Sequence, residues 1–408
     1  MQEDSTSSTN RLNILFICNK SPWPAHEGGP IAMNNLIEGL ADAGHLVKVL
    51  AINTNKYAVD PKEIPSEYHE KTHIELVYID LSIKPVSAFL NLFTKKSYHV
   101  ERFISKDFDC KLREVLMRDC YDIVQVETLF MSPYLNTIRE LSQAKIVLRA
   151  HNIEHRIWKR VASITKNQFK KLYLKHLSSM LERYEKEVIK EYDGVVPISS
   201  FDAPFFQNLT SQPVMALPTG IDPNRIPEIR TGETEHALFH IGAMNWMPNE
   251  EGIKWFIDQV WPGVHAELPD LKFYLAGREM PSWLSDLKSD QIEVVGEVPD
   301  AYGFIQSKSI LIAPLFSGSG IRIKIIESMA MGKAVISTTI GAEGINYTNG
   351  VNILIADDAD EFVLAIKTLY LNPEKAKVMG KEAQKLIFRD HNTPKIIQQL
   401  VGFYRDIL

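Results

Sequence analysis

The segment 317–345 concentrates the residues most able to do chemistry. It reads SGSGIRIKIIESMAMGKAVISTTIGAEGI and follows an apolar run of strand length. Gly318 and Gly320 after a strand predict a strand-to-helix turn, where the backbone can approach a ligand and free helix N–H groups face an anion. Arg322 and Lys324 add two cations that can hold phosphate oxygens. We therefore expect a site for a phosphorylated ligand, with a diphosphate as the natural occupant.

Glu327 lies one to two turns beyond these cations in the same predicted helix. Its carboxylate would accept hydrogen bonds from the hydroxyls of a ribose or another sugar. Ser319 lies between the two glycines and Ile321 between Gly320 and Arg322, and their backbone belongs to the same expected site. A solvated charged helix face would also carry single Lys and Glu residues. The combination with the glycines favours a ligand site.

Length and charge limit the classes of protein that this chain can be. Its 408 residues exceed the usual size of one hydrophobic core and favour two domains. Hydrophobic residues make up 45% of the chain and charged residues 24%, which supplies two cores and excludes a disordered chain. The net charge of −6 and the pI near 6.1 argue against a nucleic-acid binder.

Cysteine and histidine usage gives no sign of a metal centre. Cys18, Cys110 and Cys120 lack CxxC spacing, and the 12 histidines are dispersed. The polar residues 1–10 predict a disordered tail rather than a signal peptide, and no stretch approaches the ~20 apolar residues of a membrane span. We expect a cytoplasmic protein without a disulfide framework.

Short apolar runs alternate with helical patterns along the whole chain and predict two Rossmann-like, doubly wound parallel-sheet α/β domains in tandem. We expect residues 1–10 to be the tail, 11–213 the first domain, 214–390 the second, and 391–408 a kinked C-terminal helix that packs back on the first. Loops at the carboxyl ends of both sheets would line one cleft. The expected strands cover 12–18, 47–52, 74–79, 122–126, 145–149, 194–198, 237–241, 271–276, 292–295, 310–314, 334–337 and 352–355.

Two motifs of the first domain should face that cleft. Gly28 and Gly29 stand just before Pro30, which suits the first position of a helix, and could bind a ligand or simply form a tight turn. The pattern is not GxGxxG, so a nicotinamide or flavin site is not expected. His151 follows the strand 145–149 directly and could bond a sugar hydroxyl, or it could be structural.

Two loops of the second domain follow strands in the same way. Gly242 and Asn245 belong to the GAMNWMPN loop after strand 237–241, where small residues and amides suit close approach to a ligand. Val298 lies in the loop after strand 292–295, and its backbone could line a base pocket or form a plain turn.

The segment 156–175 is strongly basic. No acidic residue occurs between Glu154 and Glu182, while lysines, arginines and apolar residues recur at helical spacing. A solvated helix face is the simplest interpretation. An anionic membrane surface or a phosphate-bearing acceptor would also be attracted there, so peripheral contact with the inner face of the membrane is a second expectation.

The sequence GSGIRIKIIESMAMGKAVIST, preceded by LIAPL and followed by GAEGI, resembles the donor-site signature of the GT-B retaining glycosyltransferases of group 1, which are family 4-like. The likeness spans nearly the whole chain and includes RAHNIEH around His151 and the PTGID linker. It implies a UDP- or GDP-sugar donor held by the second domain, an acceptor on the first, and no metal.

Carried over residue by residue, Glu327 matches the second glutamate of the family's E-x7-E pattern, which binds the donor ribose. Ser319 stands where the first glutamate is usual, and Asn245 and Trp246 stand where the family often has Arg and Lys. Arg322 and Lys324 resemble a replacement for that pair. Residues two apart on an ideal helix diverge by ~200°, so both reach one diphosphate only if Arg322 belongs to the turn.

The resemblance implies transfer of a sugar to an acceptor hydroxyl with retention, in glycan or polysaccharide biosynthesis. Arg322, Lys324 and the amides near Gly320 would stabilise the leaving diphosphate, and His151, which matches the family's cleft residue near the anomeric carbon, would position the sugar. Two alternatives remain, a non-catalytic sugar-nucleotide binding protein and a sugar-nucleotide epimerase. The acceptor is unknown, with a lipid-linked or anionic one suggested by the basic segment.

Overall fold

A computed structural model describes residues 11–25, 27–56, 58–82, 91, 94, 96–226, 234–317 and 322–408. The chain divides into two compact units, of which the second is Ile221–Asn392 and the first comprises the residues up to Gly220 together with Thr393–Leu408. The linker up to Gly220 belongs to the first unit, where Asn35 Nδ2 donates a hydrogen bond to Gly220 O at 2.8 Å. The expected tail 1–10 lies outside the described residues.

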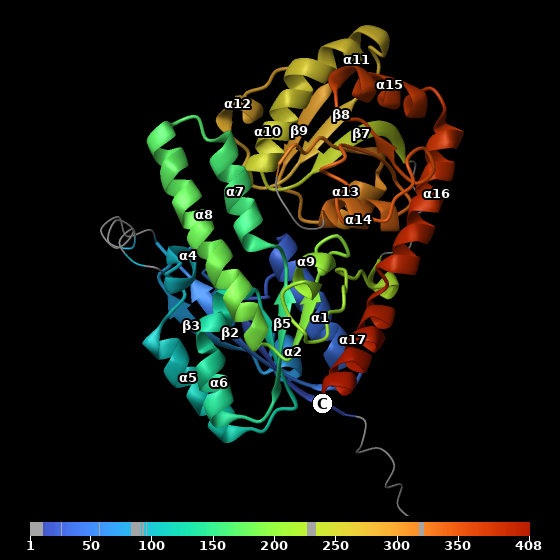
Figure 1. Cartoon of the computed structure of the whole chain (residues 1–408). Helices are drawn as coiled ribbons and strands as arrows, with labels where there is room; N and C mark the ends of the chain where they lie inside the picture. The colour runs from blue at the N-terminus through green and yellow to red at the C-terminus, as the bar shows by residue number, and fades with distance from the viewer. Residues whose placement is uncertain are drawn as a thin grey trace, which may run out of the picture. The chain divides into compact units, whose positions relative to one another are not determined.

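The first unit is built on a six-stranded parallel sheet (Figure 1). Its strands are continuous apolar runs because both faces of the sheet are covered by helices. The order β3-β2-β1-β4-β5-β6 is that of a Rossmann fold, and it reverses between β1 and β4. The strands are β1 (Asn13–Cys18), β2 (Leu46–Thr54), β3 (Glu75–Ile79), β4 (Ile123–Glu127), β5 (Lys145–Ala150) and β6 (Gly194–Pro197).

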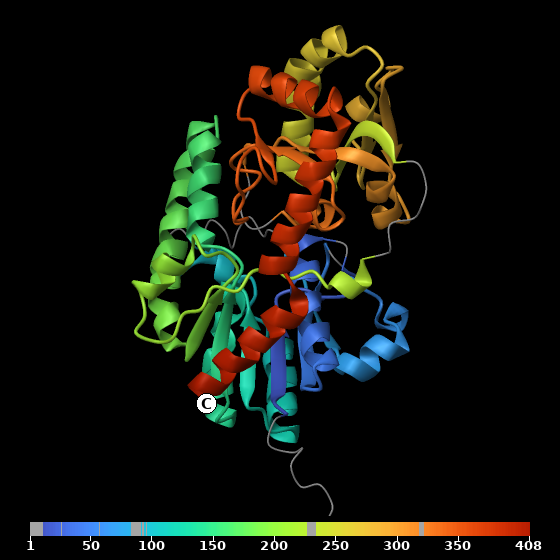
Figure 2. The ribbon, with the colours of Figure 1, turned by 90° about the vertical axis from the view of Figure 1, so that its right-hand side faces the viewer.

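Two hydrophobic cores lie on the two faces of this sheet. One packs helices that include α5, α6 and α8, and the other packs α1, α2 and the C-terminal α17. Figure 2 shows α17 running along the sheet of this unit. The helices are α1 (Gly28–Asp42), α2 (Ser66–Thr72), α4 (Tyr98–Glu101), α5 (Lys106–Arg118), α6 (Leu135–Leu141), α7 (Glu154–Ile164), α8 (Gln168–Val188), α9 (Ala203–Gln207) and α17 (Thr393–Ile407), with short η1 (Pro61–Glu63), η2 (Leu129–Tyr134) and η3 (Ile189–Glu191).

The second unit repeats the architecture. Its order β12-β11-β10-β7-β8-β9 reverses between β7 and β10, as a Rossmann fold requires. The strands are β7 (Glu235–Ile241), β8 (Phe273–Ala276), β9 (Ile292–Gly296), β10 (Lys308–Ala313), β11 (Ala334–Ser337) and β12 (Leu354–Ile355). The expected strand 352–355 is shorter because the Asn352 side chain accepts a hydrogen bond from Thr348 N at 2.8 Å and closes a turn there.

Helices again cover both faces of the second sheet, so two tandem Rossmann-like parallel sheets confirm the predicted fold class. The helices are α10 (Met247–Trp255), α11 (Trp261–Glu267), α12 (Ser282–Ser285), α13 (Ala301–Gln306), α14 (Ile323–Ala330), α15 (Ala359–Tyr370) and α16 (Pro373–Asp390), with η4 (Pro223–Arg225) and the π-helical η5 (Phe256–Val260) joining α10 to α11. None of the helices in the described ranges has the length and apolar character that crossing a membrane requires.

Candidate functional site

The centre of the second sheet offers the place where open α/β sheets bind ligands. Strand order reverses between β7 and β10, and the carboxyl ends of these strands open a crevice. The loop that starts with Gly242 follows β7, and α14 begins at Ile323 after β10. The predicted cations therefore lie at the switch point of the sheet.

Lys324 is held by two neutral side chains. Its Nζ donates to Asn249 Oδ1 at 2.6 Å and lies 3.1 Å from His240 Nε2. His240 Nδ1 lies 2.9 Å from Ile312 O, an acceptor, so Nδ1 carries the proton and Nε2 accepts from the lysine. An ammonium has three N–H donors, and these two partners leave one for a ligand.

Burial makes this cluster receptive to an anion. It lowers the pKa of Lys324 well below its usual value, and the Arg322 charge lowers it further. Burial and the Lys324 charge likewise lower the pKa of His240, which keeps the imidazole neutral. A bound anion would offset both the burial and the repulsion between the cations.

Because Gly242 has no side chain, the Lys324 ammonium can lie directly beside it. A Cβ at this position would lie 2.7 Å from Lys324 Nζ and 2.8 Å from Asn249 Nδ2. A larger residue at position 242 would therefore force the Lys324 and Asn249 side chains to shift.

Arg322 is the N-cap residue of α14, with extended φ and ψ of −85° and 95°. It therefore belongs to the turn and not to the helix, which meets the condition for both cations to reach one diphosphate. Its guanidinium carbon lies 5.4 Å from the centre of the Trp246 ring, a cation–π contact. Trp246 thus helps to hold the Arg322 guanidinium in place.

Glu327 lies on α14 and is half-buried. Tyr302 from α13 donates its hydroxyl to Glu327 Oε1 at 3.4 Å. Burial raises the pKa of Glu327 to about 7, and the hydrogen bond from Tyr302 acts in the opposite direction. A carboxylate that is costly to ionise alone is suited to accept hydroxyl donors from a ligand.

Within the described part of this unit, the other residues that the sequence predicted to bind the sugar donor are not part of the Lys324 cluster. Gly318, Ser319, Gly320 and Ile321 lie outside the described residues. Asn245 is exposed in the loop after β7. Val298 is half-buried in the loop after β9.

In the first unit, His151 follows β5 directly, as expected. Its Nε2 lies 2.6 Å from Glu127 Oε2, at the carboxyl end of β4. Glu127 is fully buried and also accepts from Gln125 Nε2 at 2.6 Å, while Arg149 Nε lies 4.0 Å away. Because a carboxylate oxygen accepts, Nε2 is the His151 nitrogen that donates to Glu127, and Nδ1 takes no part in this bond.

The support for Glu127 extends to the last helix. Tyr404 of α17 donates its hydroxyl to Gln125 Oε1, and Gln125 bonds Glu127. Arg149 is also fully buried, and its guanidinium nitrogens have no hydrogen-bond partner among the described residues. The nearby Glu127 carboxylate partly offsets the burial that lowers the pKa of Arg149. This buried network fixes the side chain that orients His151.

Gly28 and Gly29 form the first turn of α1, and the helix does not start at Pro30 as the sequence suggested. The reason is that Ile31 N already donates to Glu27 O at 2.9 Å. A Cβ on Gly29 would lie 3.1 Å from Lys20 Cε, and Lys20 pairs with Glu27 at 3.5 Å. The glycine thus lets a cation lie against the start of α1.

Several residues of these clusters were not predicted from the sequence, namely His240, Tyr302, Glu127 and Lys20, and Asn249 was expected only as part of the GAMNWMPN loop. A signal existed for two of them. His240 interrupts the apolar strand ALFHI, and Glu127 closes the apolar strand DIVQV. A polar residue inside or at the carboxyl end of a buried strand requires a partner.

The structure describes one further concave surface, a groove of about 650 Å³ between α7, α8 and the region of α9. Arg156, Phe205 and Leu209 contribute to its wall, and none of the predicted site residues does. Within the described ranges, no group of three or more His, Cys, Asp or Glu side chains could hold a metal ion.

Comparison with known proteins relates both units to one class. Residues 27–225 match the family described as "Glycosyltransferase Family 4", and residues 235–372 match "Glycosyl transferases group 1". A Klebsiella pneumoniae protein described as an "uncharacterized 44.6 kDa protein in cps region" is 23% identical over 403 residues, covering 95% of this chain and 98% of its own.

Solved structures share the fold. Sucrose-phosphate synthase from Thermosynechococcus elongatus has a TM-score of 0.68 and 17% identity, over 97% of this chain and 99% of its own. Anabaena HepE in complex with UDP has a TM-score of 0.64 and 14% identity, over 97% and 100%. Together with the two family matches, these similarities lead to the conclusion that the chain belongs to the group 1 glycosyltransferases of the GT-B fold.

Proposed function

We propose that this glycosyltransferase moves a sugar from a nucleoside diphosphate to an acceptor hydroxyl with retention of anomeric configuration and without a metal ion. Uridine is the first base to test, because a structural neighbour, Anabaena HepE, is described in complex with UDP. Guanosine remains the alternative. The acceptor is proposed to be lipid-linked or anionic, in glycan or polysaccharide biosynthesis.

The observation that carries the proposal is the Lys324 cluster at the switch point of the second sheet. Asn249 and His240 fix the ammonium, and Arg322 adds a second cation at the start of α14. As the bond from the anomeric carbon to the diphosphate breaks, negative charge grows on the leaving oxygen. Preorganised cations stabilise that charge and replace the metal that other transferases use.

The remaining roles follow from the donor and acceptor patterns of the side chains. Glu327 accepts from the ribose hydroxyls, and Tyr302 holds its carboxylate. His151 accepts from a sugar hydroxyl through Nδ1, because Glu127 occupies Nε2. The new bond forms between the anomeric carbon and the acceptor oxygen on the face that the diphosphate leaves, and the acceptor proton passes to the diphosphate.

The test starts with a thermal-shift screen of nucleoside diphosphates and their sugars, since a ligand that binds the native state raises the melting temperature. With the donor found, Arg322→Ala should reduce transfer by roughly 100- to 1000-fold, the usual loss when one stabilising donor is removed. Arg389→Ala is the matched control, because Arg389 is exposed and, among the residues that the structure describes, forms its ion pair with Asp390. Both variants should melt like the wild type.

Further readouts test the finer parts of this proposal and separate it from a non-catalytic binding protein and an epimerase. The anomeric configuration of the product, followed by NMR, tests retention, and turnover in the presence of EDTA tests metal independence. A non-catalytic binding protein would bind the sugar nucleotide but release no nucleoside diphosphate from it. An epimerase would isomerise the sugar of the donor without an acceptor. Near-normal turnover of Arg322→Ala would remove its assigned role.

A further inference from the structure

The helical hairpin of α7 and α8 ends in a tip, residues 163–172, that carries large apolar side chains in solvent. Phe169 is 88% exposed, Leu172 70% and Ile164 53%. Neither the catalytic proposal nor the packing of the first unit uses them. Three such side chains within ten residues form an apolar patch of the kind that marks an interaction surface.

The tip is also cationic, in contrast to the chain as a whole with its net charge of −6. Lys166 and Lys170 of the tip, and Lys175 three residues beyond it, pair with no carboxylate in the part of the chain that the structure describes. Lys171 donates to Ser163 O at 3.1 Å and so stays on the tip. Farther down the hairpin, Lys159 is paired with Glu182 at 2.6 Å. Lys159 is thus neutralised nearer the base of the hairpin, whereas Lys166 and Lys170 have no counter-ion among the described residues.

The base of the hairpin is braced against the first unit. The Glu185 carboxylate of α8 accepts from the backbone N–H groups of Glu154 and His155 and caps the start of α7. Trp158 of α7 stacks on His99 of α4 with ring centres 4.0 Å apart. Figures 1 and 2 show the two helices side by side, extending away from the sheet of this unit.

The tip itself has no such support. The first buried residue of α8 is Leu174, six positions after its start at Gln168, so about 9 Å of that helix buries no side chain. The supported base of the α7–α8 hairpin therefore carries a tip whose apolar and cationic side chains are exposed to solvent.

We propose that the hairpin tip binds the surface of an anionic lipid bilayer. Phe169, Leu172 and Ile164 enter the region between headgroups and acyl chains, and the lysines contact anionic headgroups. Charge complementarity favours this occupant over an apolar protein surface, because four unpaired or partly paired lysines surround the apolar side chains. The proposal is independent of the donor, the acceptor and the stereochemistry of transfer.

The experiment is co-sedimentation of the full-length protein with vesicles. Vesicles of equal parts phosphatidylglycerol and phosphatidylcholine should bind the protein, and phosphatidylcholine alone should not. Raised salt should weaken binding. Lys166→Glu combined with Lys170→Glu should lower the partition coefficient at least roughly tenfold, because each basic residue near an anionic surface adds to the attraction.

The apolar contribution is tested by Phe169→Ser combined with Leu172→Ser, which should weaken binding by a similar factor. The matched controls are Leu364→Ser, which removes an apolar side chain 65% exposed on α15, and Lys385→Glu, which reverses a charge on α16. Both controls should sediment like the wild type. All variants should keep the wild-type melting temperature and the wild-type response to nucleotides.

The proposal is wrong if the wild-type protein does not co-sediment with vesicles that contain phosphatidylglycerol. It is also wrong if the tip variants bind these vesicles as strongly as the wild type does. Analytical ultracentrifugation without lipid tests the alternative that the tip binds a second copy of this chain. If the wild type is a dimer and the tip variants are monomers, the tip is a contact between copies of this chain and the membrane proposal is wrong.

Discussion

Lys324 and Glu327 lie three positions apart on α14, a spacing at which opposite charges usually pair. No ion pair joins them among the described residues. Instead, neutral partners hold the lysine and a tyrosine hydroxyl holds the glutamate, and burial shifts both pKa values toward the uncharged form. The helix keeps two opposite charges apart at a cost in stability, as we expect of the proposed site for a ligand with both phosphates and hydroxyls.

This separation predicts that donor affinity depends on pH through Glu327. Because its pKa is raised to about 7 in the free protein, the side chain is largely protonated at pH 6 and ionised at pH 8. Ribose hydroxyls bind the ionised form, so the affinity for a UDP-sugar should rise by up to about tenfold over that interval. A UDP-sugar is the right probe, since its diphosphate has no ionisation near neutrality.

Isothermal titration calorimetry of the wild type and Glu327→Gln checks this prediction. The variant should lose the rise, and its affinity should stay level or fall with pH as the buried Lys324 loses its proton. A variant that keeps the wild-type slope would show that another group causes it.

The site could be predicted from the sequence only where its residues are close together in the chain. Arg322, Lys324 and Glu327 lie in one short segment with glycines before it. His240 and Asn249 are 84 and 75 positions from Lys324, and the pairing of β7 with β10 brings them to it. No local pattern carries that information, and only the interrupted apolar strand hinted at His240.

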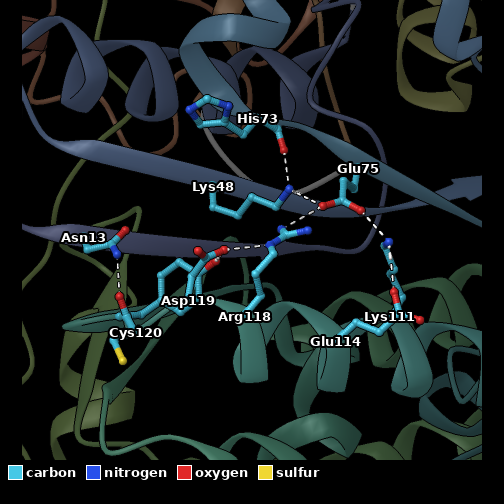
Figure 3. A network of polar contacts seen from close by, with 10 residues as sticks. Asn13, Lys48, His73, Glu75, Lys111, Glu114, Arg118, Asp119 and Cys120 are labelled. Atoms are coloured by element: carbon cyan, nitrogen blue, oxygen red, sulfur yellow. Dashed lines mark hydrogen bonds and ion pairs between the residues drawn. The ribbon is translucent and has the colours of Figure 1, made fainter.

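At the scale of elements, a cluster of charged side chains joins two strands and a helix of the first unit, near the start of β3. Lys48 of β2 donates to Glu75 of β3, while Lys111 and Arg118 of α5 contact the same carboxylate at 2.7 and 3.1 Å (Figure 3). Partial burial would raise the pKa of Glu75, but the hydrogen bonds from these three cations hold it at about 2. The carboxylate therefore ties β2, β3 and α5 together.

Removing this charge should destabilise the protein in a pH-dependent way. A depressed carboxyl pKa contributes stability that is present above its ordinary value near 4.5 and lost as pH falls toward about 2. Glu75→Gln should lower the free energy of unfolding by about 1 to 2 kcal/mol at pH 7, a figure reduced for solvent screening. The loss should shrink as pH falls below about 5.

Urea unfolding of the variant at pH 7, 5 and 4 measures this effect. Glu140→Gln is the matched control, because Glu140 is 60% exposed and its one ion pair within the described ranges is with Arg113 at 3.0 Å. It should change stability by less than about 0.5 kcal/mol at any of these pH values. A pH-independent loss in Glu75→Gln would assign the effect to packing and not to charge.

The elements themselves were largely predictable, because the fold depends on local patterns. Every expected strand is present within a few residues, since a doubly buried strand is a short apolar run. Element ends were less predictable. The start of α1 depends on the backbone bond from Ile31 to Glu27, and β12 is shortened by a side-chain bond of Asn352. Such bonds depend on three-dimensional arrangement and leave no periodic signal.

At the scale of the whole chain, each unit has its own pair of hydrophobic cores. The last helix, α17, belongs to the first unit although the chain reaches it through the second. Its fit there is close, since a Cβ on Gly39 would lie 2.8 Å from Ile397 Cγ1 and one on Gly194 would lie 2.8 Å from Phe403 Cζ. Residues at opposite ends of the chain thus share one core.

This arrangement predicts two separable contributions to thermal unfolding. Leu400 of α17 is fully buried in the core of the first unit, so Leu400→Ala should destabilise that unit by about 2 to 5 kcal/mol. Donor nucleotide should stabilise the second unit, which holds the Lys324 cluster. Differential scanning calorimetry with and without UDP should therefore show one transition lowered by the mutation and another raised by the nucleotide. Gln399→Ala is the control, because Gln399 is exposed on the same helix, and it should change neither transition. If Leu400→Ala lowers both transitions equally, the chain unfolds as a single cooperative body and the prediction is wrong.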